Sequence, residues 1–365
     1  MSKYLAYLFI TFSLTGIPLL NAQNLRSELN RYSLLNDKQM IYSSARWAHS
    51  DQSLGVQGNF SSGLKRIIGE IRNSSSEPTS IGQEVRILET LTRNLNSEKF
   101  VSLDGVIRVK LPALKTRDFD FSSSLFTKVH AGTSFSVDGQ SFALDPTAQV
   151  YLLKKIKIGA SVDILDQRGL TENRELERSL RLSLYQMQKS DFLESLAISE
   201  IASRGNLIEI DDVTQDEVTY NLDIIFDQIR KAFKWRVGVS EIHLSEKTSK
   251  ERRTEYARYP LFFGEFTYTN FNPTRYITYK PFVGAHYRSH YSLVDSFYLG
   301  VHSLFHRRDV PVRVTGLIDN QSLYFMPSLN MRYFRFGYSL KLPYRNPKDK
   351  LWVSAVHGVE LAIPF

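Results

Sequence analysis

The 365-residue chain contains no cysteine. This absence excludes a disulfide framework, a cysteine-ligated zinc or iron–sulfur site, a thiol nucleophile and a lipid anchor on cysteine. Long apolar runs are also missing beyond the N-terminus, and the mean hydropathy is slightly negative. A helical multi-span membrane protein is therefore excluded. Aromatic residues are plentiful by contrast, with 23 Phe and 19 Tyr against 3 Trp.

Acidic residues are fewer than basic ones, with 38 Asp and Glu against 46 Lys and Arg, and the net charge is +8. This balance favours an anionic partner, either a membrane surface or a nucleic acid. A basic cluster of Lys247, Lys250, Arg252 and Arg253 lies in residues 245–258, which we interpret as a solvated loop. We therefore predict no nucleic-acid partner.

The N-terminus has the pattern of an export signal. Lys3 precedes an uncharged apolar stretch, Tyr4–Leu20, and the small residue Ala22 follows. A charged start, an apolar middle and a small residue at the cut are typical of a secretory signal peptide. The alternative is an uncleaved anchor, although the stretch is at the short limit for a spanning helix. The sequence predicts a cleaved signal over residues 1–22 and export of residues 23–365.

Two segments carry the 3.6-residue period of amphipathic helices. Residues 61–98 repeat apolar side chains at spacings of three and four on both sides of a linker-like break at 73–78. Residues 190–204 contain a further repeat, with Ser190 as the cap and Gly205 beyond the end. We interpret these short helices as elements of loops that cover a surface or fill an opening.

Almost all the remaining chain alternates apolar and polar residues with period two, as half-buried strands do. In residues 155–165, for example, Ile158 and Val162 share one face, and Lys157 and Ser161 share the other. Such strands fit a soluble sandwich with the apolar face inward, or a membrane barrel with the apolar face toward lipid. Most segments reach the roughly nine residues that a tilted membrane strand needs, which favours the barrel.

We therefore predict an all-β fold, a transmembrane antiparallel β-barrel of roughly 14 strands with a few short amphipathic helices. Tyrosines gather at segment ends, as an interfacial girdle requires: Tyr276, Tyr279, Tyr287 and Tyr291. A closed barrel also leaves no unpaired strand edge in lipid.

The last strand carries a pattern of its own. Leu361, Ile363 and the terminal Phe365 share one face, and Gly358 precedes them. This pattern resembles the C-terminal assembly signal of Gram-negative outer-membrane barrels. The resemblance implies that the barrel-assembly machinery recognises this strand and inserts the protein into the cell outer membrane, among outer-membrane lipids.

Two hairpin-like stretches carry a narrower resemblance: Tyr220–Phe226 with Trp235–Val239, and Ser328–Tyr333 with Phe334–Tyr338. They resemble hairpins of the fatty-acid-transporter-like outer-membrane barrels, which include PorV-type secretion partners and conjugal-transfer TraF-type barrels. The strand–helix–helix–strand order over residues 54–111 is similar to the TraF type. The family's Asn-Pro-Ala stretch near the mature N-terminus is absent, and Leu35–Gln39 stands in its region. The resemblance thus implies a fold and a location, but not the family's plug or substrate.

The alternation also predicts which side chains line the lumen. Four of the eight histidines fall on the inward face of two neighbouring strands, with an arginine beside them. The nine lumen-lining candidates are His286, Arg288, His290, His302, His306, Lys234, Arg236, Arg335 and Lys341. Residues four apart on a strand are separated by about 13 Å, so one strand cannot supply converging metal ligands. We predict no metal site and no cofactor.

One motif invites comparison with an enzyme. His290-Tyr291-Ser292 resembles the His-x-Ser pair of outer-membrane lipid A deacylases and phospholipases, in which the histidine is the base and the serine the nucleophile. Those pairs face lipid near the membrane interface. Here the alternation places His290 and Ser292 in the lumen or the following loop, so we predict no catalytic residues and a non-enzymatic protein.

The function predicted from the sequence is that of a pore, a transporter or a partner in secretion or assembly. The alternative is a closed barrel that acts as a scaffold for a surface complex, with an outer-membrane lipid hydrolase as a remote third. An anionic or a hydrophobic solute would be the cargo. The excess of basic residues on the inward face predicts a preference for anions if the lumen is open.

Overall fold

The computed structural model describes the strands, their short connections and a few single positions. The described ranges are 52–64, 97–138, 147–166, 176–197, 217–230, 232–247, 259–269, 276–289, 291–305, 312–331, 333–345 and 352–364, with residues 34, 37, 38, 41, 42, 66, 82, 89 and 93. The predicted signal peptide, His290, His306 and Phe365 lie outside the described residues.

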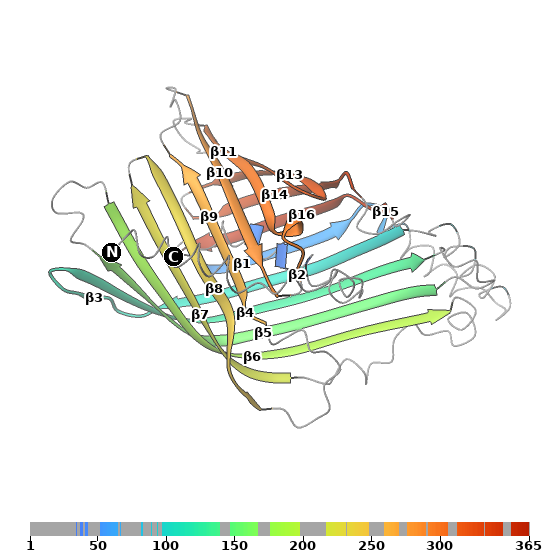
Figure 1. The fold of residues 1–365 in the computed structure, drawn as a ribbon, viewed down its shortest axis with the longest axis horizontal. Helices are drawn as coiled ribbons and strands as arrows, with labels where there is room; N and C mark the ends of the chain where they lie inside the picture. The colour runs from blue at the N-terminus through green and yellow to red at the C-terminus, as the bar shows by residue number, and fades with distance from the viewer. Residues whose placement is uncertain are drawn as a thin grey trace.

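Fourteen antiparallel strands close into a barrel, which confirms the predicted all-β fold class (Figure 1). Their bounds are β1 Gln52–Ser61, β2 Ser97–Lys110, β4 Phe119–Asp138, β5 Thr147–Asp166, β6 Leu176–Ala197, β7 Glu217–Arg230, β8 Phe233–Lys247, β9 Leu261–Tyr268, β10 Ile277–Tyr287, β11 Phe297–Phe305, β12 Val312–Asp319, β13 Ser322–Asn330, β14 Arg335–Pro343 and β16 Val356–Pro364. Two-residue strands, β3 (Leu114–Lys115) and β15 (Trp352–Val353), pair with β4 and β2.

The period-two pattern decides which face of each strand meets lipid. On β1, Val56 and Phe60 point outward and are each 46% exposed, whereas Gln57 and Asn59 point inward and are each 5% exposed. The inward groups bond to one another, with Gln57 Nε2 donating to Asn59 Oδ1 at 3.1 Å and Asn59 Nδ2 to Ser102 Oγ at 3.1 Å. Polar groups inside and apolar groups outside are what a lipid environment requires.

The barrel closes where the C-terminal strand meets the first strand. β16 pairs with β1 from Gln52↔Pro364 to Ser61↔Val356, and its other edge pairs with β14. Leu361 points outward and is 48% exposed. A Cβ on Gly358 would overlap the side chains of Ser339 and Asn59, so this inward position needs glycine. These residues of the proposed assembly signal thus form the closing seam.

Strand length varies around the barrel. β4 and β5 have 20 residues each and β6 has 22, whereas β9 and β12 have 8 each. Figure 1 shows the long strands β4, β5 and β6 extending to one side.

The helix predicted over residues 190–204 is wrong for the part that the structure describes. β6 continues as a strand to Ala197, paired with β5 from Lys154↔Ser190 to Thr147↔Ala197. The continuous backbone ladder with β5 outweighs the 3.6-residue pattern of this segment, because tertiary pairing overrides local propensity. Residues 198–204 lie outside the described part.

The predicted helical insertion at residues 61–98 lies between β1 and β2. Its first residue, 61, belongs to β1, and its last two residues, 97 and 98, belong to β2. The described residues of its interior are helical at Leu64, Arg66, Gly82, Glu89 and Arg93. In the described residues, no helix has the length and apolar character needed to cross a membrane.

Candidate functional site

A short N-terminal segment lies inside the barrel wall. Its described residues are Leu34, Asp37, Lys38, Ile41 and Tyr42, which are helical and between 1% and 7% exposed. The spacing of three and four residues places all five on one face of a helix. We call these five residues the N-terminal segment. It contacts wall residues from β9 to β13.

Asp37 forms the first anchor, with Arg288 just beyond the end of β10. Arg288 Nη2 donates to Asp37 Oδ1 at 3.0 Å, Arg288 Nε donates to Asp37 Oδ2, and the hydroxyl of Tyr291 also donates to Asp37. Both charged side chains are at most 2% exposed. Burial alone would raise the pKa of the Asp37 carboxyl, but the Arg288 guanidinium and its hydrogen bonds hold that pKa below the ordinary value.

Lys38 forms the second anchor, on the other side of the helical face. Its Nζ lies 3.0 Å from Asp319 Oδ2, at the end of β12, and 3.3 Å from Asn320 Oδ1. The Tyr42 hydroxyl donates to the same carboxylate at 3.0 Å. A buried ion pair of this kind fixes the relative position of its two side chains, because separating them leaves an uncompensated charge in the interior.

Apolar packing completes the seat of the N-terminal segment. Ile41 and Tyr42 join one buried cluster with wall residues of β9 to β13: Leu261, Phe282, Tyr298, Leu317, Tyr324 and Met326. The Tyr42 ring meets the rings of Tyr298 and Tyr324 edge-on at 5.1 and 4.8 Å between centroids. Gly284 leaves room for the Tyr298 ring, since a Cβ at position 284 would overlap that ring.

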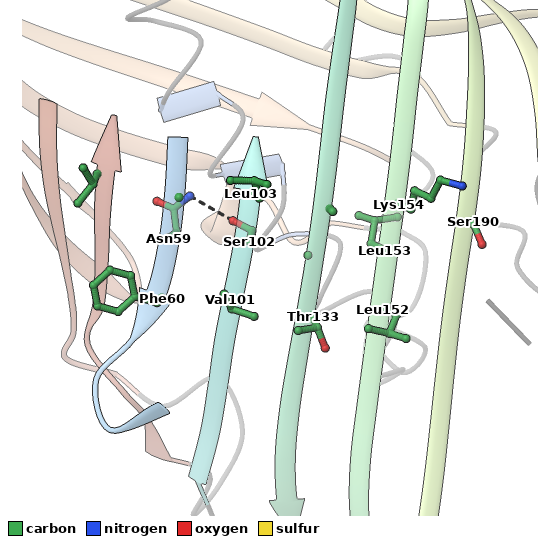
Figure 2. A pocket seen from close by; sticks show the side chains of 14 residues that line it. Asn59, Phe60, Val101, Ser102, Leu103, Thr133, Leu152, Leu153, Lys154 and Ser190 are labelled. Atoms are coloured by element: carbon green, nitrogen blue, oxygen red, sulfur yellow. Dashed lines mark hydrogen bonds between the residues drawn. The ribbon is translucent and has the colours of Figure 1, made fainter. Parts of the chain in front are cut away.

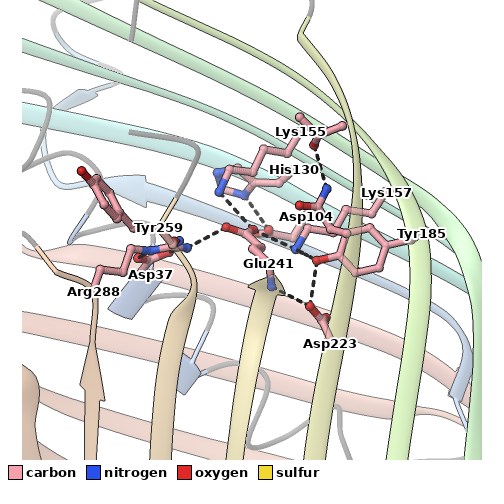
Figure 3. A network of polar contacts seen from close by, with 12 residues as sticks. Asp37, Asp104, His130, Lys155, Lys157, Tyr185, Asp223, Glu241, Tyr259 and Arg288 are labelled. Carbon is pink, nitrogen blue, oxygen red and sulfur yellow. Dashed lines mark hydrogen bonds and ion pairs between the residues drawn. The ribbon is translucent and has the colours of Figure 1, made fainter. Parts of the chain in front are cut away.

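Glu241 links the N-terminal segment to the opposite wall (Figure 3). Its carboxylate lies 2.7 Å from Arg288 Nη2, 2.9 Å from Lys157 Nζ and 3.5 Å from Lys155 Nζ. Three cations from two parts of the wall thus share one carboxylate that is 2% exposed. Such a network stabilises only when every member is satisfied.

The backbone at Glu241 is unusual. Its φ is +60°, in the left-handed region that non-glycine residues seldom adopt. The β7–β8 register shifts around Leu222 and Ile224, which marks a bulge beside Glu241. Asp223 Oδ1 accepts hydrogen bonds from the Glu241 backbone N–H and the Tyr185 hydroxyl, both at 2.8 Å. A bulge re-aims a side chain, and here it turns Glu241 into the network.

Further ion pairs cross between neighbouring strands of the wall. Arg236 Nε lies 2.7 Å from Asp227 Oδ1, and Arg181 pairs with Asp163. Arg335 Nε is 3.6 Å from Glu360 Oε1. Much of the positive charge that the sequence places in the lumen is thus set against carboxylates.

A cavity of about 220 Å³ remains beside Ile41 and Tyr42. It is bordered by five basic side chains and one acidic side chain: Lys234, Arg236, Lys280, Arg313, Arg335 and Glu265. They lie on β8, β9, β10, β12 and β14. The cavity is therefore small, enclosed by wall residues and strongly cationic.

The structure places the described lumen candidates as follows. His286 and Arg288 are each 1% exposed and lie against the N-terminal segment, where the His286 and Tyr42 rings are 6.3 Å apart. His302 borders the small cavity together with Lys234, Arg236 and Arg335, and its Nδ1 is 2.9 Å from Thr315 Oγ1. Lys341 lies with its ammonium 5.6 Å from the centre of the Tyr324 ring.

The prediction that Tyr291 belongs to a lipid-facing girdle is wrong. β10 ends at Tyr287, so the alternation does not extend to residue 291, and Tyr291 is 5% exposed and bonds to Asp37. Sequence reasoning also missed Asp37, Lys38 and Glu241. The spacing of Leu34, Asp37, Lys38, Ile41 and Tyr42 was a usable signal, because polar and apolar residues on one helical face predict burial in a polar lumen.

The described part of the chain shows no metal-binding site. No group of three or more His, Cys, Asp or Glu residues there is arranged to hold a metal ion.

No protein-family model matches the chain, and neither does any curated protein. Among solved structures, CdiB from Acinetobacter baumannii aligns with TM-score 0.39 and 11% identity over 85% of this chain and 59% of that one. A mutant of the Rh. blastica porin aligns with TM-score 0.32 and 9% identity over 86% and 99% of the two chains. The transport unit of the autotransporter AIDA-I from Escherichia coli gives 0.34 and 6% over 86% and 89%.

The chain spans about three fifths of the CdiB chain that it matches. Scores and identities this low carry no argument about function. The class follows from the chain's own geometry, a closed antiparallel sheet with apolar side chains outside and bonded polar ones within. The protein is a transmembrane β-barrel of the outer-membrane type.

Proposed function

We propose that this protein is an outer-membrane transport or secretion barrel whose lumen is closed at rest by its own N-terminal segment. The observation that carries the proposal is the double anchoring of that segment, through Asp37 to Arg288 and through Lys38 to Asp319. Two oppositely charged anchors on one helical face fix both the position and the orientation of the segment. Transport then requires that both anchors open.

The outward apolar face and the C-terminal seam support a location in the cell outer membrane. Export by a cleaved signal over residues 1–22 and insertion by the barrel-assembly machinery belong to the same proposal. So does the likeness to the fatty-acid-transporter-like superfamily, which rests on the hairpins at 220–239 and 328–338.

The chemistry of the cavity favours an anionic solute over a hydrophobic one. Five basic side chains and one acidic side chain border it, and fixed positive charge between low-dielectric walls raises the local concentration of anions. Apolar side chains such as Phe282, Leu317 and Met326 also border the cavity, so the preference rests on its basic side chains and not on a lack of apolar surface.

The test is conductance in planar bilayers. We expect the intact protein to be closed most of the time, and Asp37→Asn to open it often, because the variant leaves Arg288 without its charged partner on the segment. Asp163→Asn is the matched control, since it also removes a carboxylate from an arginine pair but lies on the wall alone. Steady conductance by the intact protein, or no change in Asp37→Asn, would contradict gating.

A closed scaffold for a surface complex is the second candidate. The near-complete burial of Lys38, Glu241 and Arg288 favours it, because opening would expose charges that the resting state satisfies. A barrel that stays closed in both Asp37→Asn and a variant lacking residues 34–42 would support the scaffold.

A further inference from the structure

A serine, a histidine and a tyrosine meet on the outer face of the barrel. Ser62 Oγ lies 2.8 Å from His357 Nε2, and the Tyr338 hydroxyl lies 2.7 Å from His357 Nδ1. With the ring proton on Nδ1 donated to Tyr338 Oη, Nε2 is free to accept the Ser62 hydroxyl proton. A nucleophile bonded to a base that a third group orients is the arrangement of an activated serine.

Three neighbouring strands hold these side chains. His357 lies on β16 and Tyr338 on β14, and Ser62 follows the last residue of β1. The Ser62 backbone N–H donates to the Ala355 carbonyl at 2.7 Å. The Phe60 ring stacks on the His357 imidazole with centroids 5.6 Å apart and planes at 28°. The seam of the barrel therefore fixes both the serine and the base.

The group faces the membrane rather than the lumen. Phe60 and Val359, which flank His357 on the same face, are 46% and 41% exposed on the outside of the wall. His357 lies at the start of β16, so the group sits at the barrel end opposite Pro364. Lys99, also close by, donates from Nζ to the Ser62 carbonyl oxygen at 3.2 Å. A lysine with its charge at a strand end marks the level of the lipid headgroups.

An apolar groove runs along the outer wall, and Phe60, two positions before the serine, belongs to its lining (Figure 2). Its volume is about 650 Å³. Phe60 and Val359 form its border next to His357, and Val101, Leu103 and Leu152 carry it across β2 to β5. Lys154 and Ser190 lie at its far side. A long apolar groove on a lipid-facing wall matches the shape and chemistry of an acyl chain.

We propose that Ser62, His357 and Tyr338 form a membrane-facing esterase site for ester-linked acyl chains of membrane lipids. The acyl chain lies in the groove, and its ester group reaches Ser62 at headgroup level. Lys99 brings positive charge to the place where an oxyanion would develop. The inference goes beyond the gated barrel, and it reverses the prediction of a non-enzymatic protein.

The reaction balances with water alone. Ser62 Oγ attacks the ester carbonyl carbon while its proton passes to His357 Nε2. The carbon–oxygen bond to the lipid alcohol then breaks, and His357 returns the proton to that alcohol. Water, deprotonated by His357, attacks the acyl-serine, the fatty acid leaves, and Ser62 recovers its proton. Tyr338 acts as a positioning residue, since it touches only the base.

The site satisfies the condition that the pair at residues 290 and 292 fails. A lipid-hydrolysing pair must face lipid near the interface, which Ser62 and His357 do from two strands distant in the sequence. No short sequence motif could have predicted this pair, because 295 positions separate Ser62 from His357.

The experiment uses the full chain folded in detergent micelles. A long-chain alkyl fluorophosphonate should label Ser62, as located by mass spectrometry, and fatty acid should be released from mixed micelles of phospholipid or of lipid A. Release from one lipid alone identifies the source of the acyl ester. We expect Ser62→Ala to abolish labelling and His357→Gln to slow it by about 10²- to 10⁴-fold. Tyr338→Phe should slow release by about tenfold and shift the acid limb of its pH–rate profile.

Ser303→Ala is the matched control, because Ser303 lies on the outward face of β11, away from the seam, and should keep full labelling. Heat-dependent gel mobility checks that each variant is folded. Labelling at another residue, or a folded wild-type protein that is neither labelled nor active on either lipid, would overturn the proposal. These outcomes are independent of gating, because the site lies outside the lumen and conductance plays no part in the readout.

Discussion

Arg288 binds Asp37 across 251 positions of sequence and, through the same Nη2 atom, binds Glu241 on another strand of the wall. One guanidinium thus joins the N-terminal segment to the barrel. Its Nη1 also donates to the Tyr259 carbonyl, so all three nitrogens have partners. Asp37 has Arg288 as its salt-bridge partner, whereas Glu241 also pairs with Lys155 and Lys157.

Removal of either partner should free the N-terminal segment, but to different degrees. Arg288→Ala leaves the buried Asp37 carboxylate without its cation and removes one of the three cations around Glu241, so it should cost about 3–5 kcal/mol of unfolding free energy, whereas Asp37→Ala should cost less. The two changes together should show coupling of about 0.5–3 kcal/mol. Urea unfolding of the four proteins in micelles measures the cycle. Additive effects would mean that the pair does not act as a unit.

Acid should release the segment only in a narrow range. The pKa of Asp37 is held below its ordinary value, so the stabilisation is complete above about pH 3.9 and is lost as the pH falls through the lowered pKa. Protease access to the N-terminus should therefore stay constant from pH 8 to pH 5 and increase only below about pH 4. An increase at pH 6 would point to another titrating group.

Loss of the charge on Glu241 should destabilise the barrel wall. Glu241→Gln keeps the shape of the side chain but leaves Lys155, Lys157 and Arg288 close together without their shared carboxylate. We expect a loss of about 3 kcal/mol in unfolding free energy, measured as a lower temperature of the heat-dependent shift in gel mobility. Thr315→Val, which removes one neutral hydrogen bond to His302, is a milder comparison.

Opening of the lumen should reveal its charge. In a variant without residues 34–42, the reversal potential in a salt gradient should report anion preference, because basic side chains dominate the border of the cavity. The preference should weaken from 0.1 M to 1 M salt as the Debye length falls from about 10 Å to about 3 Å. Cation preference, or none, would reject this expectation.

The terminal residue should matter for assembly. Phe365 is predicted to end the lipid-facing row of Leu361 and Ile363, so its removal should lower the amount of protein inserted in the outer membrane. Quantitative blotting of membrane fractions, with Leu340→Ala as an outward control on the neighbouring strand, measures the effect. Normal insertion of the truncated chain would make the C-terminal resemblance accidental.

Strand alternation predicted the barrel because lipid and lumen sort side chains by polarity along every strand. It failed at Tyr291, since nothing in the alternation marks where β10 stops. The helical spacing at 190–197 misled because backbone pairing with β5 is a contact between distant residues that the local pattern does not contain.

The sequence could not reveal the interior network for the same reason. Glu241 reads as one more polar residue of a strand, and only the bulge and the positive φ turn it toward Lys157 and Arg288. The N-terminal segment was not predicted, because the family's Asn-Pro-Ala stretch is absent from this region. The spacing of the segment's polar and apolar residues on one helical face could still have predicted its burial in the lumen. Pairings between remote parts of the chain are set by the closed sheet rather than by local composition.

The unequal strands give the barrel a slanted mouth. β4, β5 and β6 have 20 to 22 residues, each rising roughly 3.3 Å, and are about twice as long as a bilayer needs. Part of their length therefore extends beyond the membrane. Opposite them, β12 and β13 are joined by only Asn320 and Gln321. A molecule that approaches along the membrane surface therefore meets a low rim at the β12–β13 turn and a high rim at β4 to β6.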